Sequence, residues 1–227
     1  MTWSATDNFD SYTAGGNLSG AAGGSGWSGD WSAVTGTITT ETAPAGGQGG
    51  NAARCNSTAG DASYQRSFTD VSAGTASIRM RTSDTSPAND FGVILREGGV
   101  GKMYVLFGKN TAGQIAMFDG GTSTYVDIGA FSADTWYTID IDFDDAAQPN
   151  QYRVRIDGGS WTSWRDVNGS AYTNIDAFNL LDENTNTHTS WWDDIKPAAG
   201  GGSTAAHGVS KSDQQAIVQP SMAGFAA

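Results

Sequence analysis

From about residue 63 to residue 197, short runs of alternating apolar and polar residues follow one another, and Gly, Asn, Asp or Pro separates nearly every pair. Between these runs there is no helical periodicity. Many short strands joined by turn residues are typical of an antiparallel sandwich or jelly roll. The pattern therefore predicts an all-β fold, a two-sheet antiparallel jelly-roll sandwich. Its expected strands are SYQRSFTD, ASIRMRTS, FGVILRE, KMYVLFGK, QIAMFDG, STYVDIG, TWYTIDIDFD, QYRVRID, DAFNLLD and TSWWDDIK.

The clearest hairpin joins residues 136–144 to residues 151–157 across the turn DAAQPN. On the first strand apolar residues take one face, and Asp140 and Asp142 take the other. The second strand answers with Arg153 and Arg155. A symmetric turn places Asp142 opposite Arg153 and Asp140 opposite Arg155, so we expect cross-strand ion pairs that fix the register on a solvated face.

The run Asp140, Asp142 and Asp144 also resembles the start of an EF-hand calcium loop. Such a loop has glycine at position 6 and glutamate at position 12, where this chain has Asp145 and Gln151. We therefore favour the solvated face of ion pairs over a metal site here.

After Pro197 the composition changes to a stretch rich in Gly, Ala and Ser with one lysine and one aspartate. The formal charge of −12 therefore belongs to the preceding residues. We predict a jelly-roll sandwich over 1–197 and a Gly/Ala-rich linker with an apolar docking tail over 198–227; the alternative is a disordered terminus. Two apolar clusters of the tail supply candidates for docking to another protein chain, namely Ile217, Val218, Met222 and Phe225.

The charge and the apolar runs exclude some classes of function. With 24 acidic and 12 basic residues the chain lacks the basic face that nucleic-acid binding needs. No stretch approaches the roughly 18 apolar residues of a membrane span. The start, MTWSATDNFD, has neither a basic nor an apolar segment, so no Sec-type signal is expected. Cys55 is the single cysteine, so no intrachain disulfide can form.

Three segments resemble the concanavalin A-like, laminin-G-like jelly rolls. The opening DNFDSYTAGGNLSG, with the later GWSGDWS, is similar to the first strand and loop of that superfamily. TWYTIDIDFDDAAQPNQYRVRIDGGSW resembles its long hairpin, and SWWDDIK its closing strand. The resemblance covers roughly residues 6 to 197. It implies the fold and leaves the function broad, since the superfamily includes lectins, carbohydrate-binding modules, glycosidases and viral surface proteins.

Strand alternation places Trp191, Asp193 and Ile195 on one face of the closing strand. If Ile195 points into the core, Asp193 does too, and a buried carboxylate needs hydrogen bonds, an arginine or a cation. The resemblance implies a structural calcium ion (Ca²⁺) between the first and last strands, which would make Asp7 and Asp10 co-ligands of Asp193. A hydrogen-bonded Asp193 and a calcium site both remain open.

Catalytic residues are not evident. The resemblance implies that a glycosidase on this fold carries Glu-x-Asp-x-x-Glu on one strand, but Glu41, Glu97 and Glu183 are scattered. His188 and His207 are the only histidines, and no Cys or Ser elbow lies near His188, which we expect to be an exposed loop residue. We therefore expect no enzymatic activity.

Glycan binding needs flat aromatic faces beside polar groups. The candidates lie near turns among Gly, Ser and Asp, and they are Trp27, Trp31, Tyr125, Trp161 and Trp164. The alternative is that these rings belong to the core or cover the ends of the sandwich.

Two functions follow. The first is a non-catalytic structural or assembly protein, a jelly roll on the surface of a virion (phage capsid decoration or tail), anchored to other chains through residues 198–227, with possible glycan binding. The second is a secreted or cell-surface, lectin-like carbohydrate-binding module, stabilised by calcium and bound to polysaccharide. A glycoside hydrolase comes third. We expect neither nucleic acid nor membrane as a partner, and a location on the virion surface or outside the cell.

Overall fold

The computed structural model describes residues 3–56, 61–85, 89–144, 146, 148–184 and 187–198. These residues form two seven-stranded sheets in which all strand pairs are antiparallel. Residues 199–227, with the docking candidates Ile217, Val218, Met222 and Phe225, lie outside the described part of the chain. No helix within that part is long and apolar enough to cross a membrane.

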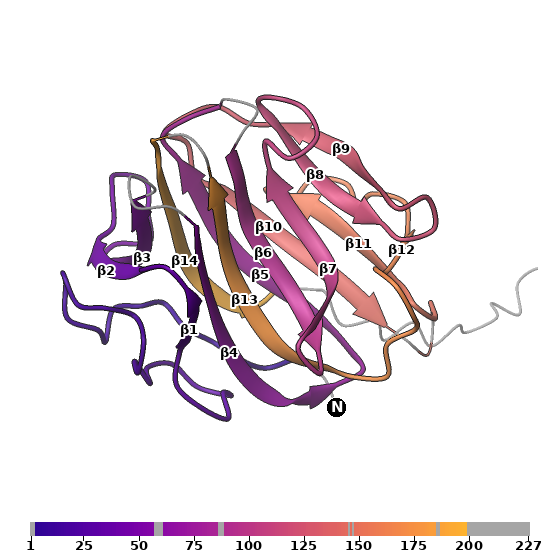
Figure 1. The fold of residues 1–227 in the computed structure, drawn as a ribbon, viewed down its shortest axis with the longest axis horizontal. Coiled ribbons are helices and arrows are strands. Elements are labelled where there is room, and N and C mark those ends of the chain that lie inside the picture. Colours follow the sequence, from indigo (N-terminus) through magenta and orange to yellow (C-terminus); the bar gives the residue numbers. More distant parts are fainter. Residues whose placement is uncertain are drawn as a thin grey trace, which may run out of the picture.

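The first sheet has the order β1-β4-β13-β6-β7-β8-β9. Its strands are β1 (Ser32–Thr35), β4 (Ala62–Val71), β13 (Ile175–Asn184), β6 (Asn89–Glu97), β7 (Val100–Phe107), β8 (Gln114–Asp119) and β9 (Thr124–Ala130). The second sheet has the order β12-β11-β10-β5-β14-β3-β2. Its strands are β12 (Arg165–Asp166), β11 (Gln151–Ile156), β10 (Tyr137–Asp144), β5 (Ala73–Thr82), β14 (Thr189–Pro197), β3 (Asn51–Asn56) and β2 (Thr39–Thr42). Figure 1 shows the sheets stacked as two layers, which confirms the predicted jelly-roll sandwich.

The inward faces of both sheets supply the main hydrophobic core. Trp192 of β14 is fully buried there, and its indole Nε1 donates to the carbonyl of Gly92 on the opposite sheet at 3.0 Å. A Cβ on Gly92 would lie 2.0 Å from the carbonyl oxygen of Val105, so the strands can approach closely only with glycine at that position. The hydroxyl of the buried Tyr152 on β11 likewise donates to the carbonyl of Phe118 on β8 at 2.6 Å. Apolar packing and buried hydrogen bonds thus hold the layers together.

The predicted hairpin register is confirmed, because Asp142 pairs with Arg153 and Asp140 with Arg155 across β10 and β11. Their ion pairs measure 2.8 Å and 2.6 Å. The expected solvated face is wrong, however, since Asp140 and Asp142 are each only 4% exposed. The arginine side chains cover the carboxylates, so these ion pairs are partly desolvated.

The expected alternation along SWWDDIK is also wrong. Trp192 and Ile195 both face the core, and the pairing of β14 with β5 shifts register between Asp193 and Lys196. Asp194 causes the shift, because its φ of 53° places it in the left-handed region and inserts an extra residue into the strand. Asp193 is buried as predicted, at 0% exposure, but it does not share a face with Ile195.

Before β3 the chain forms two short strands, β1 in the first sheet and β2 in the second. Gly36, between them, has a φ of 61°, and a Cβ there would lie 2.1 Å from the carbonyl oxygen of Asp61. The chain therefore crosses from one sheet to the other at this glycine.

Candidate functional site

A hollow of about 210 Å³ opens on the outer face of the first sheet, over β4, β13, β6, β7 and β9. Its floor is a small apolar cluster of Ile94, Leu106 and Leu181, which are 7%, 2% and 6% exposed. This cluster is separate from the core between the sheets. Large aliphatic side chains on the outer face of a sheet, with no second layer over them, are the usual floor of a binding site.

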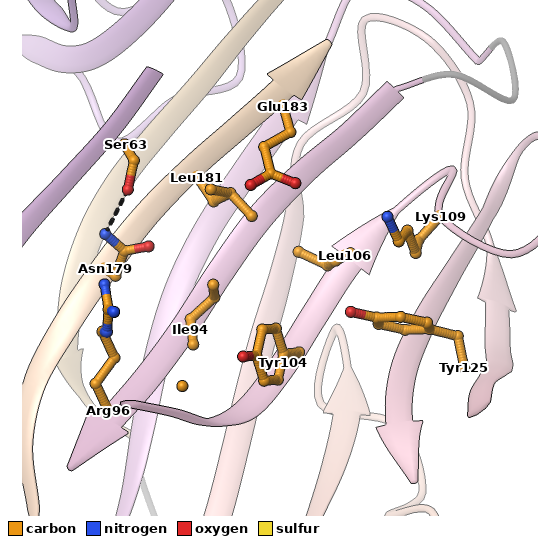
Figure 2. A pocket seen from close by; sticks show the side chains of 11 residues that line it. Ser63, Ile94, Arg96, Tyr104, Leu106, Lys109, Tyr125, Asn179, Leu181 and Glu183 are labelled. Atoms are coloured by element: carbon orange, nitrogen blue, oxygen red, sulfur yellow. Dashed lines mark hydrogen bonds between the residues drawn. The ribbon is translucent and has the colours of Figure 1, made fainter. Parts of the chain in front are cut away.

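Two tyrosines form one side of the hollow, as Figure 2 shows. Tyr104 and Tyr125 both pack against the apolar floor and flank Phe118, with ring centres 5.8 Å and 5.1 Å from it. Burial raises the pKa of Tyr125, and the nearby phenol of Tyr104 adds to this, so the Tyr125 hydroxyl stays neutral. A neutral phenol can both donate and accept a hydrogen bond.

Asn179 lies on the opposite side of the hollow and is 1% exposed. Its amide Nδ2 donates to the hydroxyl of Ser63 and to the carbonyl of Tyr64, both at 3.0 Å, which fixes the orientation of the side chain. Its Oδ1 is buried and accepts no hydrogen bond from any residue in the described part of the chain. A buried acceptor left unpaired costs about 1–3 kcal/mol, so a ligand donor at this oxygen would be favoured.

Three charged residues complete the lining. Lys109 forms an ion pair with Asp90, and its ammonium lies 5.7 Å from the ring centre of Tyr125. Glu183 is exposed, and Arg96 is half-buried. The hollow therefore combines an apolar floor, aromatic rings, an unpaired acceptor and a cation, and its size suits one part of a longer polar ligand rather than a whole drug-sized molecule.

Only Tyr125 of the five predicted glycan-binding aromatics lines this hollow. The sequence reasoning missed Tyr104, Asn179, Arg96 and the apolar floor. A signal was present in the runs FGVILRE, MYVLF and FNLLD, which are apolar at successive positions where a one-sided sheet would alternate. Such runs indicate strands with apolar side chains on both faces.

Trp31 is not accessible to a ligand, so its prediction as a glycan-binding residue is wrong. It is 1% exposed, and its indole donates to Asp7 at 2.9 Å. Trp27 is half-buried at one end of the sandwich, where it packs edge-on against Trp3 and Phe68 and lines a hollow of about 200 Å³. Trp31 is thus part of the core and Trp27 packs against it, while glycan binding by Trp27 stays a prediction.

Trp161 and Trp164 lie on the outer face of the second sheet. The Arg153 guanidinium is 4.8 Å from the ring centre of Trp161 and 4.6 Å from that of Trp164, and the Arg155 guanidinium is 4.5 Å from Trp161. These cation–π contacts engage the two half-buried tryptophans with the chain's own arginines.

A larger hollow of about 350 Å³ is lined by residues of β9, the edge strand of the first sheet, and of β10, β11 and the loop after β11. It is lined by Ile128, Tyr137, Ile156, Ser160 and neighbouring residues. None of its lining side chains has a buried polar atom without a partner. It therefore lacks the unmet hydrogen-bonding group that distinguishes the hollow on the first sheet.

Asp7, a predicted calcium ligand, is 1% exposed and saturated by protein groups. Its Oδ2 accepts from the Arg66 guanidinium at 2.7 Å, from the Trp31 indole at 2.9 Å and from the Tyr12 hydroxyl at 2.6 Å. Its Oδ1 accepts from the backbone amide of Phe9 at 3.0 Å. This network ties the start of the described chain to β4.

The other two predicted ligands lie apart from this network. Asp10 is exposed, and its carboxylate accepts from the amide of Asn51 and the side chain of Asn8, both at 2.8 Å. Asp193 accepts from the amide of Gln48 at 3.2 Å, and its Oδ1 is buried with no donor in the described ranges. Within the described ranges, no group of three or more His, Cys, Asp or Glu side chains could hold a metal ion. Asp7, Asp10 and Asp193 are thus not brought together as one ligand set, and calcium binding stays a prediction.

The expectation that His188 is exposed is wrong. It is 2% exposed, and its Nε2 lies 3.2 Å from a carboxylate oxygen of the fully buried Asp182. Burial raises the pKa of the nearby Cys55 thiol, and the charge of Asp182 adds to this. The thiol is therefore protonated and a poor nucleophile, which favours a structural role for this cluster.

The three glutamates considered for catalysis are held in different places. Glu41 pairs with Arg54 at 3.8 Å, and Glu97 accepts from the backbone amides of Thr173 and Asn174. Glu183 lines the hollow on the first sheet. A paired-carboxylate arrangement of the retaining or inverting kind is not formed by these glutamates, and the absence of enzymatic activity stays a prediction.

No protein-family model matches the chain, and a comparison with curated protein sequences finds no match. Solved structures with a similar fold include a sialidase, with a TM-score of 0.56 and 10% identity over 75% of this chain and 17% of that one. They also include the cellulose induced protein Cip1, with a TM-score of 0.52, 13% identity and coverage of 85% and 96%.

A structure of botulinum neurotoxin type C, whose cell entry depends on interaction with two ganglioside molecules, has a TM-score of 0.52 and 7% identity over 80% of this chain and 47% of that one. This chain therefore spans only part of the sialidase and toxin chains. At these identities the likeness concerns the fold alone. The chain has the fold of a two-sheet antiparallel jelly-roll sandwich.

Proposed function

We propose that this sandwich is a carbohydrate-binding module and that its site is the hollow on the outer face of the first sheet. The observation that carries the proposal is the unpaired Oδ1 of Asn179, buried beside an apolar floor and facing two tyrosines. A sugar ring offers the complementary chemistry, because its C–H faces pack on apolar and aromatic side chains while its hydroxyls donate hydrogen bonds.

The fold adds support, since similar sandwiches occur in a sialidase and in a toxin that interacts with gangliosides. Glycan binding was the second function predicted from the sequence, and the site now proposed differs from the predicted one. Of the predicted aromatics it retains Tyr125 and leaves Trp27, Trp31, Trp161 and Trp164 outside.

The test is retention on a panel of immobilised polysaccharides, followed by calorimetry with the best ligand. We expect Tyr125→Ala to weaken binding by about tenfold, equivalent to about 1.4 kcal/mol, through lost ring contact. Trp164→Ala is the matched control, because it also truncates a half-buried aromatic ring but on the second sheet. Loss of binding in Trp164→Ala alone would move the site to the second sheet.

The assembly function predicted from residues 198–227 stays a second proposal. Residues 199–227 lie outside the described part of the chain, and the location on a virion surface or outside the cell is equally untested. Deletion of residues 198–227 should abolish incorporation into a particle while the sandwich stays folded. Unchanged incorporation would refute the docking role of Ile217, Val218, Met222 and Phe225.

A further inference from the structure

Arg96 has no carboxylate partner among the described residues, although the chain has 24 acidic and only 12 basic residues. Nine other basic residues of the described chain form ion pairs, namely Arg54, Arg66, Arg81, Lys102, Lys109, Arg153, Arg155, Arg165 and Lys196. Arg79, also without an ion pair there, stacks on Trp136 and donates to the carbonyl of Gly46. Arg96 alone combines an unpaired charge with a place in the lining of the hollow.

Only part of the hydrogen-bonding capacity of the Arg96 guanidinium is used. One terminal nitrogen donates to the carbonyl of Gly99, while its Nε is buried and has no acceptor among the residues that the structure describes. Figure 2 shows the side chain reaching along the sheet toward Asn179. An unmet donor with a full positive charge and an unmet acceptor therefore lie on the same side of the hollow. The planar guanidinium fork matches a carboxylate better than any neutral group, because both can form two parallel hydrogen bonds.

The other charges facing the hollow do not compete for this position. Lys109 is already paired with Asp90. In the backbone register of β13 and β6, Glu183 lies opposite Asp90, and Ala177 lies opposite Arg96. The backbone positions of Glu183 and Arg96 are therefore six residues apart along β6. At about 3.3 Å per residue this is roughly 20 Å, beyond the Debye length of about 8 Å at physiological salt. The same screening weakens repulsion from the overall charge of −12.

We propose that the hollow selects a glycan carrying a carboxylate, an acidic sugar whose carboxylate pairs with Arg96 and whose hydroxyl donates to Asn179 Oδ1. This inference rests on the proposed carbohydrate-binding function and adds the charge of the ligand. The shared chemistry is a sugar carboxylate, and it can come from the uronic acids of a polysaccharide or from a terminal sialic acid.

The experiment compares ligands that differ only in the carboxylate. Polygalacturonate and its carboxyl-reduced form, and sialyllactose and lactose, are titrated into the full chain by calorimetry. We expect at least one acidic ligand to bind about tenfold or more tightly than its neutral counterpart, and the pair that shows this identifies the source. Binding of the acidic ligand should also weaken as salt is raised.

Variants locate the carboxylate on Arg96. Arg96→Gln should remove the preference for the acidic ligand, and Arg96→Lys should keep part of it because the charge remains without the fork. Arg54→Gln is the control, since it removes the same charge from β3 on the second sheet.

The possible outcomes separate the two proposals. Equal binding of acidic and neutral ligands, unaffected by Arg96→Gln, would overturn the acidic-sugar proposal and leave the carbohydrate-binding function standing. If none of these ligands and no polysaccharide of the panel binds, the proposed function fails and the inference fails with it. If Arg96→Gln does not fold, the comparison of acidic with neutral ligands on the unaltered chain still tests whether the protein prefers a glycan with a carboxylate.

Discussion

The substitution Asp193→Asn should stabilise the fold at neutral pH and change its dependence on pH. Burial raises the pKa of Asp193 from 3.8 to about 6, although the backbone amides of Gln48 and Asp194 partly offset this. The side chain is fully buried, and one of its oxygens has no partner. Ionisation of this carboxyl is therefore unfavourable in the folded state.

The sign and size of the effect of Asp193 on stability follow from the linkage between its protonation and folding. Between pH 4 and pH 6 the folded state holds a proton that the unfolded state has lost, so the stability contributed by Asp193 is complete below about pH 4 and is lost as the pH rises through 6. A difference of about two pH units corresponds to about 3 kcal/mol. Asn cannot ionise, so the variant does not lose this stability. As the pH rises from 4 to 8, its free energy of unfolding should come to exceed that of the original chain by up to about 3 kcal/mol.

The assay is urea unfolding of both proteins at several pH values, with the difference in unfolding free energy plotted against pH. Asp194→Asn is the comparison variant, because asparagine tolerates the left-handed backbone of that residue. It removes a neighbouring charge that raises the pKa of Asp193 but leaves Asp193 able to ionise, so the pH dependence should be reduced and not abolished. Parallel pH profiles for Asp193→Asn and the original chain would refute the reasoning. Repeating the series in calcium and in chelator also tests calcium binding, since a ligand role predicts calcium-dependent stabilisation in the original chain only.

Two further predictions concern buried neighbours. His188→Ala leaves the carboxylate of Asp182 buried without the imidazole and should destabilise the fold by about 3–5 kcal/mol in urea unfolding; a change below about 1 kcal/mol would contradict the role of this pair. Gly101→Ala places a Cβ 2.2 Å from the hydroxyl of Tyr104, so that ring must leave its position in the hollow. We expect weaker glycan binding with little change in melting temperature, and unchanged calorimetric affinity would argue against Tyr104 as part of the site.

The sequence predicted the local features of the fold well. Alternation along residues 136–157 fixed the register of β10 and β11, because each strand carries its own pattern and the turn between them is short. The same rule failed at Asp194, where one left-handed residue reverses the alternation. Between Val34 and Thr40 the sequence predicted no register, and there Gly36 sends the chain from one sheet to the other.

The residues of the candidate site were predicted less well from the sequence. Aromatic residues near turns were taken as binding residues, yet Trp31 packs in the core and Trp161 stacks on arginines. Whether an aromatic ring is accessible to a ligand depends on which side chains cover it, and those side chains come from residues distant in the sequence.

The sequence by itself determined the all-β class, the strands from β4 onward except β12, and the pairing of Asp142 with Arg153, since all of these depend on the periodicity of neighbouring residues. Only the tertiary structure placed β13 between β4 and β6 and so put Asn179 beside Arg96. That juxtaposition depends on strand order, which no local pattern encodes, because a strand with apolar residues on both faces can pair with any similar strand.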